Sequence, residues 1–345
     1  MKYLVSQNYG NTENNHAGIS YFCRLLQTMY PHIYKCIYVD RTPLIHFLPA
    51  KYGYMIKINV FIRKIRQRKK IKIATRLLMS QVTANDQIIL MEYLDNQVDY
   101  YLAARTIKAN IPKIRIYGMS HLVPEKLNKM FNDKTLYKWL EPIEKIITLG
   151  SSLSEYYLSR NIPQNRIITL FHPLDDYYIE KIQRENDVLT VIVQGNQMRD
   201  IDMLVKVVKD NPSVLFRICQ GYNDYSSIFK FANVQLIPFV EEPLLKNYMR
   251  QSDVSLNIMK DTIGSNVIVT SLGMSLAMIC SDVGSIRNYC TEENTFFCKT
   301  LDDYNGAIKK LSQNGKLLSK MQNSSYYHSL NFRIDKFHQL FVTID

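Results

Sequence analysis

The sequence predicts an α/β protein with two doubly wound domains, each a parallel sheet covered by helices. Two observations carry this prediction. Short β-branched runs alternate with segments of helical period along the whole chain. The polar stretch 175–187 (DDYYIEKIQREND) separates two series of such elements, with apolar strand patterns on both sides of it. A chain of 345 residues is also long enough for about two domains.

The first series predicts six strands with helices between them. The strands are expected at Lys2–Ser6, Tyr34–Val39, Gln87–Met91, Lys113–Gly118, Lys145–Leu149 and Arg166–Leu170, and the helices at Ile19–Met29, Leu94–Ile107 and Ser152–Arg160. For the last of these helices, Ser151 is the expected N-cap and Glu155 completes a capping-box pattern.

The second series repeats this order. Strands are expected at Val188–Gln194, Val214–Gln220, Val234–Pro238, Val254–Met259, Ala277–Ser281 and Phe296–Lys299, and helices at Arg199–Val208, Pro243–Arg250, Leu301–Leu311, Leu317–His328 and Asp335–Val342. We therefore place an N-terminal domain at 1–174, a linker at 175–187, a C-terminal domain at 188–330, and a final segment at 331–345 whose helix is expected to pack back on the N-terminal domain.

Composition excludes several protein classes. Hydrophobic residues make up 46% of the chain, enough for a sizeable core, so the chain is not disordered. No apolar run approaches the roughly 20 residues of a membrane-spanning helix, and the N-terminus lacks the apolar region of a secretory signal. The six cysteines show no CxxC spacing, so we expect reduced thiols rather than disulfides or a metal site, and a cytoplasmic location.

Two candidate ligand-binding segments lie in the first half. The polar run 9–18 has Gly10 and Gly18 near its ends and precedes the first predicted helix, an arrangement that lets the backbone approach a ligand. An ordinary loop is the alternative. His121 follows the strand at Lys113–Gly118, at the sheet edge where ligands bind in this architecture. It is a candidate contact for a substrate hydroxyl, and a structural loop histidine is the alternative.

Two further segments lie in the second half. Arg199 suits a diphosphate because a guanidinium binds phosphate oxygens bidentately, and a solvated surface charge is the alternative. The amides of Gly264–Asn266 form an anion site if a helix follows them. The β-branched residues 267–269 disfavour that helix. We nevertheless predict it, since the strand at Ala277–Ser281 needs a crossover before it.

Taken in order, these segments resemble the family-four retaining glycosyltransferases, which have the GT-B fold. The match spans nearly the whole chain. Residues 146–175 resemble the family's strand, serine-rich helix start and following turn, residues 191–208 its Gly-Arg and Lys-Gly segment, and residues 252–290 the segment with its two glutamates. The sequence departs from the family at several positions. Asn196 replaces an arginine, and Arg199 stands where lysine is usual. The first glutamate falls near Asp261 or Thr262, the second near Thr270, and the usual Gly-x-Pro becomes residues 275–277 (SLA).

The resemblance implies transfer of a sugar from a UDP- or GDP-sugar, with retention of configuration and without a metal ion or another cofactor. It implies the catalytic residues His121, Arg199 and Asp261. It implies donor contacts from Gly10, Gly18, Gly195, Asn196, Phe239, Val240, Gly264, Ser265, Asn266 and Thr270. In this assignment the nucleobase packs at 239–240, the ribose lies at Thr270, and the acceptor is bound by the first domain. The alternative is a GT-B-like pseudoenzyme that serves as a binding or scaffolding subunit, because donor-site side chains are lost at Asn196 and Thr270.

The distribution of charge along the chain bears on what the acceptor is. The chain carries 43 Lys+Arg against 31 Asp+Glu, a net charge of +12, and the basic excess lies wholly in residues 1–174. Residues 61–76 form a predicted basic amphipathic helix suited to an anionic membrane surface, with basic residues Arg63, Lys64, Arg66, Arg68, Lys69, Lys70, Lys72 and Arg76. A solvated helix face is the alternative. Nucleic acid is not expected, since no nucleic-acid-binding motif is present. We therefore expect a peripheral membrane enzyme with a lipid-linked glycan acceptor in bacterial cell-surface polysaccharide biosynthesis.

Overall fold

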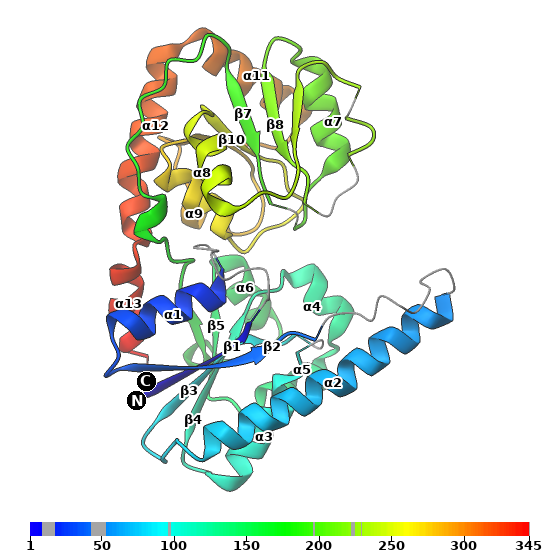
Figure 1. Cartoon of the computed structure of the whole chain (residues 1–345), viewed down its shortest axis with the longest axis vertical. Helices are drawn as coiled ribbons and strands as arrows, with labels where there is room; N and C mark the ends of the chain where they lie inside the picture. The colour runs from blue at the N-terminus through cyan, green and yellow to red at the C-terminus, as the bar shows by residue number, and fades with distance from the viewer. Residues whose placement is uncertain are drawn as a thin grey trace. The chain divides into compact units, whose positions relative to one another are not determined.

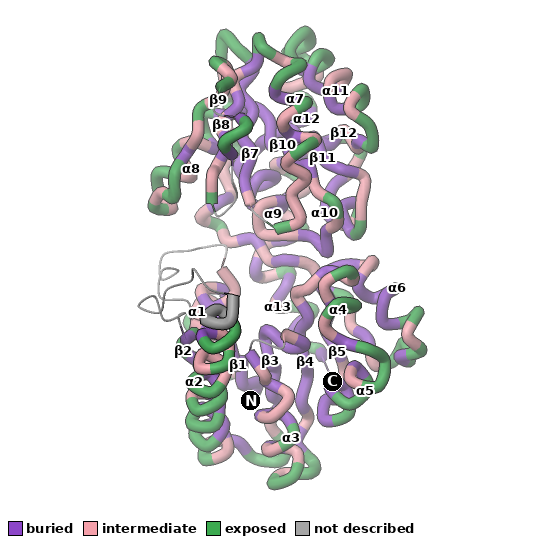
Figure 2. Tube along the Cα trace, turned by 90° about the vertical axis from the view of Figure 1, so that its right-hand side faces the viewer, coloured by how far each residue is buried: buried purple, intermediate pink, exposed green. Residues whose placement is uncertain are grey.

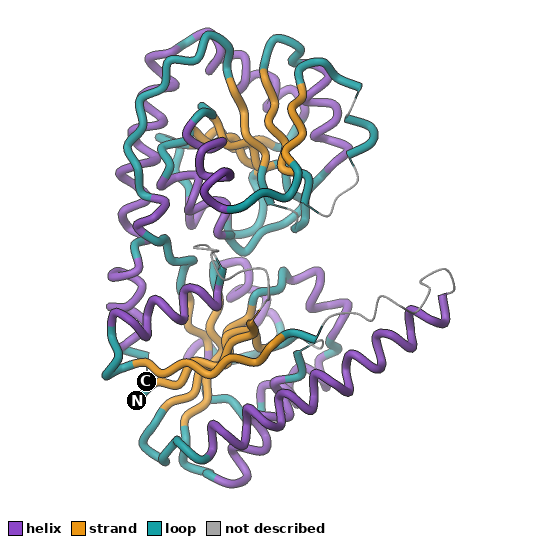
Figure 3. The backbone as a smooth tube through the Cα atoms, in the orientation of Figure 1, coloured by secondary structure: helices purple, strands orange, loops and turns teal. Residues whose placement is uncertain are grey.

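A computed structural model describes residues 1–8, 18–42, 53–95, 98–195, 197–221, 225–228 and 230–344. The chain divides by packing into two compact units, residues 1–170 and 171–345 (Figure 1). Each unit is built on one six-stranded parallel sheet with helices packed against it, so the predicted fold class is confirmed (Figure 3). All six cysteines are free thiols, and four of them are buried.

The first unit has the strand order β2-β1-β3-β4-β5-β6. Its strands are β1 (Lys2–Asn8), β2 (Tyr34–Asp40), β3 (Gln87–Tyr93), β4 (Arg115–Ser120), β5 (Lys145–Thr148) and β6 (Ile167–Thr169). Its helices are α1 (Ile19–Met29), α2 (Gly53–Met79), α3 (Tyr100–Asn110), α4 (Pro124–Met130), α5 (Asp133–Leu140) and α6 (Ser151–Ser159). Every residue of β3 is buried, as expected for a central parallel strand covered on both faces.

The second unit has the strand order β12-β11-β10-β7-β8-β9. Its strands are β7 (Thr190–Val193), β8 (Leu215–Cys219), β9 (Val234–Ile237), β10 (Val254–Asn257), β11 (Ala277–Ser281) and β12 (Thr295–Cys298). Its helices are α7 (Ile201–Asp210), α8 (Glu242–Arg250), α9 (Asn266–Gly273), α10 (Ile286–Tyr289), α11 (Leu301–Gln313), α12 (Gly315–Ser329) and α13 (Ile334–Val342). The predicted crossover helix before β11 is therefore confirmed as α9.

Three local predictions are wrong. The helix predicted from Leu94 begins only at Tyr100, because Leu94 and Asp99 both adopt left-handed backbone angles (φ 59° and 60°) that end the strand without starting a helix. The predicted serine cap of α6 is absent. The helix begins one residue earlier than expected, Gly150 is its N-cap, and no side chain caps it.

The third correction concerns α2, which is not a two-sided amphipathic helix. Its 27 residues carry apolar side chains on two faces. Ile71, Ala74 and Leu78 are buried on the face that packs against β2 and α3, whereas Phe61 and Ile73 are 64% and 66% exposed. Figure 2 shows exposed residues along much of this helix. The inner apolar residues therefore belong to the core, and the outer ones lie among the basic side chains.

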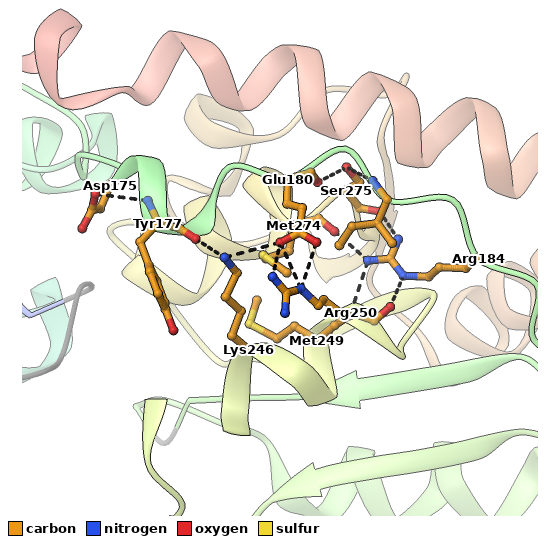
Figure 4. A network of polar contacts seen from close by, with 10 residues as sticks. Asp175, Tyr177, Glu180, Arg184, Lys246, Met249, Arg250, Met274 and Ser275 are labelled. Atoms are coloured by element: carbon orange, nitrogen blue, oxygen red, sulfur yellow. Dashed lines mark hydrogen bonds and ion pairs between the residues drawn. The ribbon is translucent and has the colours of Figure 1, made fainter. Parts of the chain in front are cut away.

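The polar stretch 175–187 is fastened to the second unit (Figure 4). The Arg184 guanidinium donates hydrogen bonds to the carbonyls of Ser275 (2.7 Å), Met274 (2.6 Å) and Arg250 (2.9 Å). Glu180 pairs with the Arg250 guanidinium at 2.8 Å. Burial lowers the pKa of Arg184 to about 10, and the carbonyl dipoles around it offset part of the cost of burying its charge. This segment is therefore part of the packed structure of the second unit.

Candidate functional site

Two loops of the second unit meet beyond the carboxyl ends of β7 and β10. The Lys260 amide donates to the Met198 carbonyl at 2.7 Å, and the Asp200 amide donates to the Ile258 carbonyl at 3.1 Å. Arg199 and Met259 form an antiparallel bridge between the two loops. This pairing brings together two segments about 60 residues apart in sequence, at the sheet edge where α/β proteins bind ligands.

Two glycines allow the backbone to take this path. Gly195 has φ 78°, and a Cβ there would lie 3.2 Å from Cγ2 of Val267, so the loop after β7 runs close to the first turn of α9. Gly264 has φ 92°, and a Cβ there would overlap the ring of Tyr289. Only glycine takes both the left-handed angle and this close approach without strain. Sequence reasoning missed Tyr289, which lies on the short helix α10 and gave no local signal.

The N-terminus of α9 is the part of this edge suited to an anion. Ser265 is the N-cap and accepts a hydrogen bond from the Ile268 amide through its hydroxyl (3.4 Å). The Gly264 amide donates to Oγ1 of Thr262 at 3.0 Å, so one of the three predicted anion-binding amides has a partner within the loop. The partial positive charge of the helix N-terminus still favours an anion beside Ser265 and Asn266.

The other predicted donor-site side chains belong to several elements of the second unit. The Arg199 guanidinium donates to the Tyr225 hydroxyl at 2.6 Å and to the Gln194 carbonyl, and burial lowers its pKa. The Thr270 hydroxyl donates back into its own helix, to the Asn266 carbonyl at 2.8 Å. Phe239 and Val240 follow the edge strand β9, and the Phe239 side chain is 76% exposed, as an aromatic platform for a planar ring requires.

The Asp261 carboxylate is held by backbone groups close to it. Its Oδ1 accepts a hydrogen bond from the Thr262 amide at 2.7 Å. A Cβ on Gly284 would lie 2.6 Å from the same oxygen, so the loop after β11 closes over this carboxylate. Asp261 thus sits between the loops after β10 and β11, in the same cluster as Gly264 and Ser265.

In the first unit, His121 follows β4 and is held by the neighbouring strand. Its Nε2 lies 2.5 Å from the Met91 carbonyl, and burial lowers its pKa to about 4. The imidazole is therefore neutral at pH 7, and its proton lies on Nε2 because a carbonyl only accepts hydrogen bonds. Gly18 is the N-cap of α1 in an extended conformation. Gly10 and Asn196 lie outside the described residues.

Sequence reasoning missed a buried carboxyl group at the carboxyl end of β3. Glu92 accepts hydrogen bonds from the Gln7 amide (3.2 and 3.3 Å) and the Ser6 hydroxyl (3.2 Å), both on β1. Burial raises its pKa to about 8, and the nearby charge of Asp95 acts in the same direction. The only sequence signal is one acid at the end of an otherwise apolar run, QIILMEY.

The predicted basic surface lies on α2, and some of its basic side chains have partners within the protein. Arg68 pairs with Asp99 at 2.6 Å, and Lys70 donates to the Asp40 carbonyl at 3.2 Å. Arg63 and Lys64 are half-buried. The exposed remainder is Arg66, Lys69, Lys72 and Arg76.

Neither a family model nor a curated protein sequence matches this chain. Several solved structures do. The chain is similar to the pneumococcal O-GlcNAc transferase GtfA (TM-score 0.61, 17% identity, 79% of this chain and 58% of that chain). It is similar to the lipopolysaccharide outer core galactosyltransferase WaaB (TM-score 0.67, 13% identity, 99% and 98% covered). It is also similar to the sucrose-phosphate synthase of Thermosynechococcus elongatus (TM-score 0.72, 11% identity, 99% and 97% covered).

The chain has the GT-B fold. The fold predicted from the sequence resemblance is therefore confirmed, whereas identities of 11–17% carry no statement about substrate. Within the part of the chain that the structure describes, no helix is long and apolar enough to span a bilayer. Among the same residues, no three His, Cys, Asp or Glu side chains are grouped so as to hold a metal ion.

Proposed function

We propose that this chain is a retaining glycosyltransferase that moves a sugar from a nucleotide diphosphate to a lipid-linked glycan in bacterial cell-surface polysaccharide biosynthesis. One observation carries the proposal. In a chain with the GT-B fold, the loops after β7 and β10 pair with each other at Arg199 and Met259, and the loop after β7 runs close to the first turn of α9 at Gly195. GtfA, one of the similar structures, was solved with UDP and GlcNAc.

The proposed chemistry assigns the diphosphate to the N-terminus of α9 and to Arg199. The bond between the sugar C1 and the diphosphate oxygen breaks, and the bond between C1 and the acceptor oxygen forms on the same face of the sugar. Negative charge builds on the leaving diphosphate, and a helix N-terminus with a guanidinium stabilises that charge. The exposed ring of Phe239 takes the nucleobase. The acceptor proton leaves with the diphosphate or with solvent.

His121 contacts a substrate hydroxyl in this proposal, and its chemistry limits what it does. As a neutral imidazole with its proton on Nε2, it is not a cation at pH 7 and stabilises no phosphate charge. Its role is to orient a hydroxyl rather than to pair with the diphosphate.

The outward face of α2 supports the peripheral membrane part of the proposal. Exposed apolar side chains, including Phe61, Ile65, Ile73 and Leu77, alternate there with four exposed basic residues. Such a face buries apolar area among acyl chains while its cations meet anionic headgroups. An anionic membrane that carries the acceptor also accounts for a basic excess confined to residues 1–174.

A nucleotide-sugar screen tests the enzymatic proposal. UDP or GDP should raise the melting temperature, and one sugar conjugate of that nucleotide should be hydrolysed slowly without an acceptor. Arg199→Ala should raise the Michaelis constant for that donor at least tenfold. Because the Arg199 guanidinium also pairs with Tyr225 and the Gln194 carbonyl, the melting temperature of the variant is measured alongside. Arg217→Ala is the matched control. Arg217 also donates two side-chain hydrogen bonds, to Gln235 and to the Gln251 carbonyl, and it lies away from the paired loops.

A scaffolding pseudoenzyme is the second candidate, and a specific observation favours it. The Arg199 guanidinium and the Thr270 hydroxyl already have partners within the protein, so both side chains have structural uses. If no nucleotide raises the melting temperature and no nucleotide sugar is consumed, the transferase proposal is wrong and the scaffold remains.

A further inference from the structure

A polar pocket lies within the first unit. It has a volume of about 30 Å³ and is lined by the ends of β1 and β2, the first half of α2 and the turn after β3. The lining residues are Gln7, Arg41, Thr42, Arg63, Gln67, Asp95 and Val98. One side chain in this list is apolar, so the pocket is not a packing defect of the hydrophobic core.

Two deeply buried side chains in this pocket have polar atoms without a partner in the described part of the chain. Thr42 and Gln67 are each 4% exposed. The Gln67 Oε1 accepts a hydrogen bond from the Thr42 amide at 2.9 Å, which fixes the orientation of the side-chain amide. The Thr42 hydroxyl and the Gln67 Nε2 remain without a partner among those residues. Burying such groups unpaired is unfavourable, so a ligand that pairs with them gains binding free energy.

The unpaired groups select the ligand's chemistry. Gln67 Nε2 donates hydrogen bonds only, whereas the Thr42 hydroxyl can donate one and can also accept. Among the described lining residues, Arg41 and Arg63 add two positive charges against the one negative charge of Asp95, so this part of the lining carries a net positive charge at pH 7. Donors with net positive charge match an oxyanion. A volume of about 30 Å³ holds roughly two water-sized groups, which suits the oxygens of one carboxylate or phosphoryl group.

We propose that this pocket binds a single oxyanion group, a carboxylate or a phosphate, carried by the acceptor. The acceptor assignment rests on the proposed function, whereas the anion site stands on the pocket alone. Arg63 and Gln67 lie one helical turn apart on α2 and point into the same pocket, so this helix presents an anion-binding face there and a separate exposed basic face outward.

Direct binding tests this proposal without any transfer reaction. Inorganic phosphate and sodium glucuronate are titrated separately at constant ionic strength by calorimetry, with glucose as the neutral control. The expected result is saturable binding of one of the two anions and none of glucose, and the preferred anion identifies the source as phosphoryl or carboxylate. Thr42→Val keeps the shape of the side chain and should weaken binding at least fivefold without lowering the melting temperature, because the hydroxyl it removes has no partner among the described residues.

Arg63→Gln should weaken binding at least tenfold. Arg66→Gln, which makes the same change on the outward face of the same helix, should leave it unchanged. Equal binding by wild type, Thr42→Val and Arg63→Gln, or no anion binding by the wild type, overturns the proposal. If the wild type binds UDP or GDP but neither anion, the pocket proposal is refuted and the proposed function stands. If the wild type binds an anion but no nucleotide, the proposed function is refuted and the pocket proposal stands.

Discussion

The buried carboxyl of Glu92 makes the first unit less stable as pH rises. Its pKa is about 8 in the folded protein, against an ordinary value of 4.5. A carboxyl with a raised folded pKa contributes stability that is fully present below pH 4.5 and is lost as pH rises to 8. Between these values the unfolded chain releases its proton and the folded chain keeps it, which costs about 1.4 kcal/mol per pH unit. From pH 5 to pH 7 the loss is about 2–3 kcal/mol.

The variant Glu92→Gln removes this loss. A glutamine carbonyl still accepts the hydrogen bond from the Gln7 amide, so the variant keeps the contact and removes the titration. The free energy of unfolding of the wild type, minus that of Glu92→Gln, should fall by about 2–3 kcal/mol between pH 5 and pH 7 and level off above pH 8. Taking this difference cancels the contributions of the histidines, which both proteins share.

Urea unfolding followed by tryptophan fluorescence measures this difference in the relevant unit. The chain has one tryptophan, Trp139, and it is buried in the first unit beside Tyr93, so its emission reports that unit. Glu141→Gln is the matched control, because it makes the same substitution at an exposed position of the same unit. A pH-independent difference for Glu92→Gln, or a wild type that gains stability relative to the variant as pH rises, would refute the reasoning.

Three further predictions concern other parts of the molecule. Gly264→Ala should lower the free energy of unfolding by about 2–3 kcal/mol, because the backbone at Gly264 is left-handed and the added methyl group overlaps the ring of Tyr289. An unchanged melting temperature together with unchanged nucleotide binding would contradict this prediction. Arg184→Met should destabilise the second unit by about 2–3 kcal/mol, because it leaves carbonyls unpaired. The circular dichroism signal should then begin to fall at a lower urea concentration, while the transition seen by Trp139 fluorescence is unchanged. A shift of both transitions together would contradict this prediction. Serine replacements of the four outward basic residues of α2 should reduce flotation with anionic liposomes at least tenfold at low salt. The matched control replaces the exposed lysines of other first-unit elements, Lys113, Lys129, Lys134 and Lys138, and equal flotation of both variants would remove the membrane proposal.

Local pattern was sufficient to predict most of the elements. The helix at Ile19–Met29 and the strand at Ala277–Ser281 are found with the predicted bounds, because apolar period and β-branched composition are properties of short segments. The helix α9 was predicted against its propensity from topology, since a parallel strand requires a crossover. Alternation along the whole chain likewise determined the fold class.

Local pattern did not determine what each side chain meets. Nothing in the run QIILMEY shows that Glu92 lies against β1, and nothing in the basic run of α2 shows that Arg63 faces a pocket while Arg66 faces outward. The stretch 175–187 was polar enough to be a linker, but Arg184 fastens it to the second unit through carbonyls about 65 to 90 residues away. Periodicity is set by neighbours in sequence, whereas burial, pKa and hydrogen-bond partners are set by neighbours in space. The sequence therefore determined the two sheets and their order of elements, and only the packed structure decided which charges are buried, paired or available to a ligand.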